Sequence, residues 1–238
     1  MNNPEEKLIV ALDYSCWEDA EKLVKMIPEA KYFKVGLELY LASKGSAVRK
    51  LRELGKEVFL DLKFHDIPNT VAKACCQATT QGATIFNIHA SGGREMMSKA
   101  VQATKETSEK QGIPRPLLIA VTVLTSFDED GFKEIGMNNI EQSVINFVRL
   151  AEEIGIDGVV ASPKEVKIIR ENCQPGFKII CPGVRPVWAA TNDQKRITTP
   201  GKAISLGADY LVVGRPITSA ADPRKAALKV LEEIKEAK

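Results

Sequence analysis

Residues 57–90 read EVFLDLKFHDIPNTVAKACCQATTQGATIFNIHA and contain one strand–helix–strand repeat. The two ends, 57–63 and 84–90, are short runs rich in apolar residues, as expected of parallel strands that are covered on both faces. The segment between them, 68–81, begins with a proline and is followed by Gly82, which are the residues that favour the first turn and the end of a helix. This stretch therefore predicts a βαβ unit.

The same alternation extends over the whole chain. Further strands are predicted at 8–13, 32–36, 117–124, 158–162, 177–183 and 210–214, and further helices at 17–27, 39–54, 94–110, 140–154, 163–172, 201–206 and 223–236. Eight elements of each kind predict an α/β fold, a single-domain (β/α)8 TIM barrel over residues 1–238 with its active site at the C-terminal ends of the strands. A doubly wound open sheet is the alternative, but it usually has fewer repeats.

Composition indicates a soluble, intracellular protein. The 238 residues are 44% hydrophobic and 27% charged, and the net charge of +2 is scattered along the chain, so neither a nucleic acid nor a membrane is expected as a partner. The five cysteines include no C-x-x-C pair, which is typical of reduced thiols. The N-terminal MNNPEEKLIVALD lacks the pattern of a secretion signal, and we expect a cytoplasmic location.

Charged residues gather where the predicted strands end. Asp13 ends the first strand, Lys34 lies inside the second, and Asp61, Lys63 and Asp66 follow the third. A single aspartate at a strand end more often caps the next helix, and a lone lysine can extend from a barrel wall. Four of these charges alternate in sign along the chain: Lys34, Asp61, Lys63 and Asp66. Such an array is harder to explain in this way, because a buried ion network contributes little to stability. The array therefore indicates a catalytic site, whereas Asn87 and His89 are interpreted as core or supporting polar groups.

One further feature indicates a phosphorylated substrate, and another indicates binding loops. Gly214 and Arg215 lie between the last strand and the last helix, where many barrels hold a phosphate on backbone N–H groups and an arginine. The connections 125–139 and 184–199 are too long to be simple turns, and loops of this length are usually lids or binding loops. No role can be assigned to 126–139 from its residues.

These motifs together resemble one enzyme family. The D-x-K-x-x-D pattern in LDLKFHDIPNT, followed in order by VTVLTS, PGVRP, NDQKRITTP and VVGRPIT and preceded by FKVGLELY, is similar to orotidine 5'-monophosphate decarboxylases, in particular the bacterial form. The resemblance extends from residue 11 to residue 221. It implies a lyase that converts orotidine 5'-monophosphate to uridine 5'-monophosphate, the last step of de novo pyrimidine nucleotide synthesis, without a cofactor or metal.

The resemblance also implies roles for individual residues. Lys63 would protonate the ring carbon that loses carbon dioxide, Asp61 would face the substrate carboxylate, and Lys34 would bridge the acids and touch the ribose. Asp66 and Thr70 would reach into the neighbouring subunit of a homodimer. The remaining substrate contacts would be Asp13 on the ribose, Thr125 at the pyrimidine edge, and Arg185, Gln194, Gly214 and Arg215 on the phosphate.

Two alternatives remain open at this point. Magnesium-dependent sugar-phosphate decarboxylases and hexulose-phosphate synthases share the D-x-K-x-x-D strand but have a glutamate on the second strand, where this chain has Lys34, whose ammonium would repel Mg²⁺. A barrel that only binds a phosphorylated ligand would explain Gly214 and Arg215 but would leave the charged array without a purpose.

Overall fold

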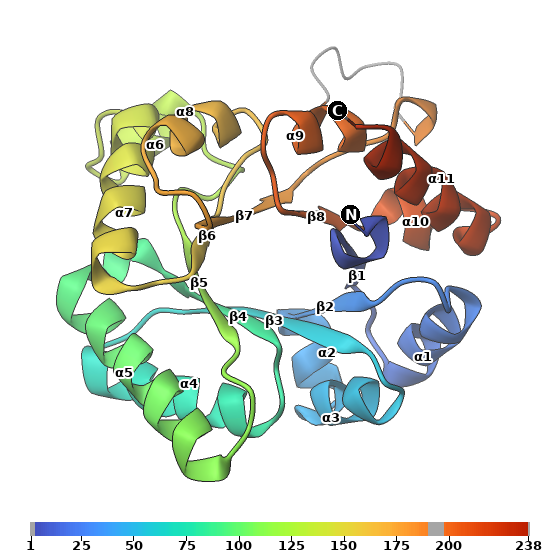
Figure 1. The fold of residues 1–238 in the computed structure, drawn as a ribbon, viewed down its shortest axis with the longest axis horizontal. Helices are drawn as coiled ribbons and strands as arrows, with labels where there is room; N and C mark the ends of the chain where they lie inside the picture. The colour runs from blue at the N-terminus through green and yellow to red at the C-terminus, as the bar shows by residue number, and fades with distance from the viewer. Residues whose placement is uncertain (1–2, 190–197, 238) are drawn as a thin grey trace.

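The parallel strands close into a barrel in chain order, and the prediction of a (β/α)8 barrel is confirmed (Figure 1). The computed structural model describes residues 3–189 and 198–237. The last strand pairs with the first through Leu8 and Leu211, so no edge is left open. The strands are β1 Leu8–Leu12, β2 Tyr32–Gly36, β3 Glu57–Phe64, β4 Ile85–His89, β5 Leu117–Val121, β6 Gly158–Val160, β7 Lys178–Pro182 and β8 Tyr210–Val213.

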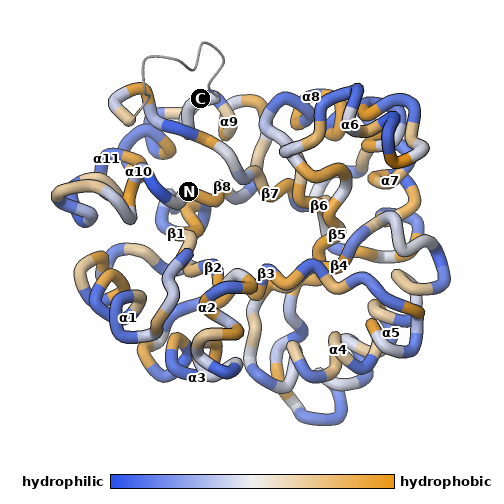
Figure 2. Tube along the Cα trace, turned by 180° about the vertical axis from the view of Figure 1, so that it is seen from behind, coloured by the Kyte–Doolittle hydropathy of each residue, from blue (hydrophilic) through white to orange (hydrophobic). Residues whose placement is uncertain are grey.

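Helices surround the barrel (Figure 1), and hydrophobic and hydrophilic residues alternate along them (Figure 2). The buried apolar residues of the helices belong to one core cluster with residues of the strands. In the part of the chain that the structure describes, no helix is long and apolar enough to cross a membrane. The α-helices are α1 Trp17–Met26, α2 Leu37–Ala42, α3 Ser46–Glu53, α4 Pro68–Thr80, α5 Gly93–Gln111, α6 Glu129–Glu134, α7 Ile140–Ile154, α8 Val166–Glu171, α9 Pro200–Ser205, α10 Arg215–Thr218 and α11 Pro223–Glu236. Short 3₁₀ turns are η1 Pro4–Glu6, η2 Ala90–Gly92 and η3 Val187–Ala189.

Two predicted segments differ from the structure. The helix expected over 39–54 is two helices, because Lys44 and Gly45 adopt left-handed backbone conformations with φ of 52° and 78° between α2 and α3. The loop expected at 125–139 contains α6, whose Asp128 side chain caps the helix by accepting from the Gly131 N–H at 2.9 Å. The helices α2, α3 and α6 are short, and their limits depend on caps and turns, which hydrophobic periodicity does not detect.

Apolar side chains form two layers on the two sides of the strands. The layer inside the barrel is small and comes from all around it: Ile9, Ala11, Phe59, Ile85, Ile119, Val121, Val160, Ile180 and Val212. The much larger outer layer joins the strands to the helices. The inner layer fills the lower barrel, so polar side chains on the same strands come together above it, at the C-terminal ends.

Candidate active site

Four charged side chains form a connected ion network at the C-terminal ends of β1, β2 and β3. Lys34 is paired in register with Ala11 and Phe59, both of the inner layer, so its side chain also faces the inside of the barrel. Its Nζ lies 2.9 Å from Asp13 Oδ1 and 3.6 Å from Asp61 Oδ2. The Lys63 Nζ lies 2.7 Å from Asp61 Oδ1. The structure therefore brings Asp13, Lys34, Asp61 and Lys63 together as the sequence predicted.

Gly36 provides the space for this network. It is paired in register with Asp61, on the strand that carries Lys34. A Cβ atom at this position would lie 3.0 Å from Lys34 Nζ and 3.7 Å from Asp13 Oδ1. The glycine therefore leaves open the volume that the lysine ammonium occupies, a role that the sequence analysis missed.

Lys63 reaches Asp61 from an irregular backbone rather than from a regular strand. Leu60 pairs with Phe86 and Phe64 pairs with Ile88, so three residues of β3 lie opposite Asn87 alone. Within this bulge Lys63 has a φ of 52°. Left-handed conformations cost a non-glycine residue about 1–3 kcal/mol and are concentrated at functional sites. Simple alternation along the strand predicted the Asp61–Lys63 contact but not this geometry.

Asn87 lies behind the charged pair and is fully buried. Its Nδ2 donates to Asp61 Oδ1 at 2.7 Å, and its Oδ1 accepts from the Lys63 backbone N–H at 2.8 Å. The sequence analysis interpreted Asn87 only as a core or supporting group. Asn87 lies two residues after Ile85, an inner-layer residue of the same strand, so its side chain also faces the inside of the barrel. This spacing is the signal in the sequence that could have connected Asn87 with the site.

The electrostatics favour an ionised Asp61. Burial alone would raise the pKa of its carboxyl, but Lys34, Lys63 and the Asn87 amide outweigh burial and lower that pKa below its ordinary value. Nearby, His65 and His89 stack with ring centroids 5.3 Å apart. Burial, followed by the neighbouring His65 and Lys63, lowers the pKa of His89, so this imidazole is neutral at pH 7.

The other predicted residues of the β3–α4 and β5–α6 connections lie outside the network. Asp66 and Thr70 are exposed, and the Asp66 carboxylate accepts from the Ile67 backbone N–H at 2.7 Å. Of the four alternating charges expected to lie together, Lys34, Asp61 and Lys63 do so within this chain, and Asp66 does not. Thr125 lies exposed in the turn after β5.

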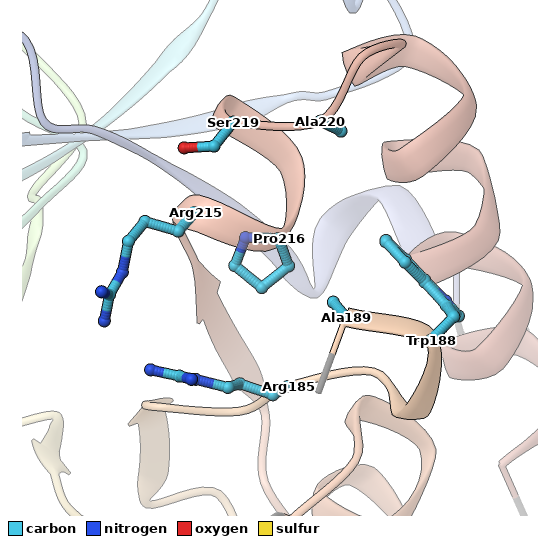
Figure 3. Close-up of a pocket in the computed structure, with 7 residues that line it drawn as sticks. All are labelled: Arg185, Trp188, Ala189, Arg215, Pro216, Ser219 and Ala220. Atoms are coloured by element: carbon cyan, nitrogen blue, oxygen red, sulfur yellow. The ribbon is translucent and has the colours of Figure 1, made fainter. Parts of the chain in front are cut away.

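A cavity of about 230 Å³ adjoins Lys34 and Asp13 and extends to the ends of β7 and β8. Arg185, Gly214 and Arg215 line it, and Arg185 and Arg215 also line a neighbouring pocket beside Trp188. In Figure 3 both guanidinium groups extend toward the same space, from the loop after β7 and from the start of α10. Gln194, the other predicted phosphate contact, lies outside the described residues.

Gly214 leaves this cavity open. A Cβ atom there would lie 3.6 Å from Ala11 Cβ and 3.7 Å from Asp13 Oδ2, two residues of the cavity wall. A larger side chain would therefore project into the space between Lys34 and the two arginines. The cavity combines cationic walls with open volume, which suits an anionic group joined to a molecule that extends toward Lys63.

Comparison with known proteins assigns the family. Residues 6–230 match the family described as Orotidine 5'-phosphate decarboxylase / HUMPS family. The chain is 48% identical to an orotidine 5'-phosphate decarboxylase of Syntrophomonas wolfei over 236 residues, which are 98% of this chain and 99% of the relative. The chain belongs to the orotidine 5'-phosphate decarboxylase family. The predicted resemblance is thereby confirmed.

Other members of the family agree in sequence and in fold. An orotidine 5'-phosphate decarboxylase of Geotalea daltonii is 49% identical over 230 residues, covering 96% of this chain and 95% of the relative. The crystal structure of orotidine 5'-phosphate decarboxylase from Lactobacillus acidophilus superimposes with a TM-score of 0.85 at 34% identity, covering 96% of this chain and 98% of that one. The likeness therefore extends over the whole barrel, including the strands that carry the ion network.

Proposed function

We propose that this protein decarboxylates orotidine 5'-monophosphate to uridine 5'-monophosphate, the last step of pyrimidine nucleotide synthesis. The observation that carries the proposal is the Lys34–Asp61–Lys63 network, held at the strand ends beside a cavity lined by two arginines. Its relatives carry the name of this enzyme. A barrel that only binds a phosphorylated ligand would not need a lysine in a strained conformation against a partly buried aspartate.

Lys63 is the proton donor in this proposal. Loss of carbon dioxide leaves a carbanion on the pyrimidine ring, and an ammonium oriented by Asp61 at 2.7 Å stabilises that charge and then protonates the carbon. Repulsion between Asp61 and the substrate carboxylate, at about 4 Å, is worth only about 1–4 kcal/mol. Enzymes lower barriers by roughly 8–23 kcal/mol. Electrostatic stabilisation by the preorganised ammonium is therefore the larger effect.

The remaining residues bind the nucleotide. Asp13 and Lys34 hold the ribose, Thr125 contacts the pyrimidine edge, and Arg185, Gln194, Gly214 and Arg215 hold the phosphate. The cavity supports this assignment, since Asp13, Lys34, Arg185 and Arg215 all line it. Binding energy from the phosphate, which does not react, can then contribute to lowering the barrier at the ring.

The reaction is proposed to proceed without a metal. Lys34 Nζ lies between Asp13 and Asp61, at 2.9 and 3.6 Å, and so occupies the position where these carboxylates would otherwise attract a cation. Across residues 3–189 and 198–237, no group of three or more His, Cys, Asp or Glu side chains is arranged to hold a metal ion. Both observations count against the magnesium-dependent alternative within the wider family.

The active unit is proposed to be a homodimer in which Asp66 and Thr70 enter the partner's site. Asp66 is exposed beside Ile67, which is 68% exposed, and Leu41 and Leu37 on α2 are 71% and 58% exposed. Burial of exposed apolar side chains favours association with a partner. A second copy would cover them and would bring another carboxylate to the Lys63 ammonium.

The first experiment follows the ultraviolet absorbance of orotidine 5'-monophosphate with EDTA present, comparing the native chain with Lys63→Ala. We expect turnover in the native chain that is insensitive to EDTA and is lost in the variant, because the ammonium is removed. Turnover only with added Mg²⁺, or none at all, would refute the proposal and favour the sugar-phosphate enzymes.

A further inference from the structure

Asn87 uses both ends of its amide on the two residues at the centre of the site. Its Nδ2 donates to Asp61 at 2.7 Å and its Oδ1 accepts from the Lys63 backbone N–H at 2.8 Å, while the side chain is 0% exposed. We propose that Asn87 is a positioning residue for decarboxylation, an inference that rests on the proposed function. Asn87 fixes the left-handed backbone of Lys63 and the orientation of the Asp61 carboxylate that faces the Lys63 ammonium.

The strand pairing shows why a side chain is needed here. In a regular ladder the backbone of β4 would pair with each residue of β3 in turn. Because Asp61, Leu62 and Lys63 lie opposite Asn87 alone, the ladder is interrupted and the Lys63 N–H has lost its regular partner. The Asn87 carbonyl takes the place of a backbone acceptor. Lys63 can therefore keep a φ of 52° without leaving a buried donor unsatisfied.

The chemistry of the two contacts selects an amide. The position needs an acceptor toward the Lys63 N–H and a donor toward an ionised carboxylate, and a neutral amide supplies both. Since Nδ2 of Asn87 and Nζ of Lys63 both contact Asp61 Oδ1, the carboxylate cannot rotate freely. Its other oxygen, Oδ2, is then directed toward Lys34 at 3.6 Å. An aspartate in place of Asn87 would set two carboxylates against each other, and an alanine would leave both contacts unmade.

Two variants and one control test this role. Asn87→Ala removes both hydrogen bonds, and Asn87→Asp changes the donor into a titratable group of the same shape. Thr104→Ala is the control, because Thr104 is equally buried and its hydroxyl donates to the Ala100 carbonyl within α5, at 2.8 Å. For each protein, kcat and KM for orotidine 5'-monophosphate are measured against pH, together with the melting temperature.

For Asn87→Ala we expect kcat to fall roughly 10- to 100-fold, the effect of removing a hydrogen bond to a charged group, with KM changed less than about threefold because the phosphate cavity is untouched. Thr104→Ala should lower the melting temperature with kcat unchanged.

Asn87→Asp should show pH-dependent rescue. Beside Asp61 the new carboxyl takes up a proton well above its ordinary pKa, because two adjacent carboxylates share one proton. The protonated form has the donor and the acceptor of the amide. The ratio of its kcat to that of the native chain should therefore rise as the pH falls from about 8 to about 5.

The outcomes separate the two proposals. If the native chain turns over the nucleotide while Asn87→Ala keeps kcat within about threefold and shows only a lowered melting temperature, as the control does, Asn87 is structural and the inference is wrong. If Asn87→Ala does not fold, the pH ratio of Asn87→Asp decides, and a flat ratio overturns the inference. A native chain without turnover refutes the proposed function itself, before any variant is compared.

Discussion

At the scale of single residues, the site depends on a glycine, Gly36, as much as on the charged side chains. Gly36 has an extended backbone, with φ of −90° and ψ of −177°, that alanine adopts equally well. The missing Cβ would lie 3.0 Å from Lys34 Nζ, so alanine would displace the ammonium from Asp13 and Asp61 rather than disturb the strand.

We therefore predict that Gly36→Ala lowers kcat/KM roughly 10- to 100-fold, the usual cost of a small misplacement of a catalytic group, and leaves the melting temperature unchanged. Steady-state kinetics and thermal denaturation check both parts. Full efficiency in the alanine variant would show that Lys34 adapts and that the glycine has no part in the site.

At the scale of elements, one local motif recurs where even-numbered strands begin. A glycine with positive φ is followed by a buried apolar residue and then by a side chain that accepts a backbone N–H from the preceding strand. The three copies are Gly82–Thr84 before β4, Gly155–Asp157 before β6 and Gly207–Asp209 before β8. Thr84 accepts from the Val58 N–H at 3.2 Å. Asp157 accepts from the Leu118 N–H, and Asp209 from the Ile179 N–H, each at 2.8 Å. This motif joins neighbouring strands at the face opposite the site.

Asp209 has more partners than the other aspartate, Asp157, because Arg170 and Lys178 also pair with its carboxylate. We predict that Asp209→Ala lowers the free energy of unfolding by about 1.5–3 kcal/mol, the loss of hydrogen bonds to a charged group, with kcat unaltered since the N-terminal face of a barrel serves stability. Denaturant titration measures the effect. Asp130→Ala, at a side chain that is 94% exposed, is the control and should change little; equal losses in the two variants would contradict the prediction.

At the scale of the whole molecule, the charge that completes the site is proposed to come from a second copy. Asp66 faces solvent within this chain and is not part of the ion network. If it acts in the partner's site, a mixed dimer of Lys63→Ala and Asp66→Ala chains contains one site with both native residues. If it acts in its own site, every site in the mixture lacks one of them.

We predict that the two inactive variants regain about a quarter of native activity after they are mixed and allowed to exchange subunits, as statistical pairing in a symmetric dimer requires. Activity is measured before and after exchange, with each variant alone as the control. A mixture that stays inactive although exchange is demonstrated would place Asp66 in the site of its own chain.

The barrel and the charged residues at its strand ends could be predicted from the sequence. Alternating apolar runs and amphipathic segments are local signals, and the ion network follows from them because strand ends meet at one face of a barrel. Family membership and the identities of Asp13, Lys34, Asp61 and Lys63 were likewise evident from the order of the motifs.

How those charges are held depends on contacts between strands that are distant in the sequence. The bulge in β3, the left-handed Lys63, the two hydrogen bonds of Asn87 and the space above Gly36 all depend on which residues of neighbouring strands lie opposite one another. Asn87 is 24 residues from Lys63 in the chain. A contact over that distance is fixed by the register of two paired strands, and a one-residue shift in register would remove it without changing any local pattern in the sequence.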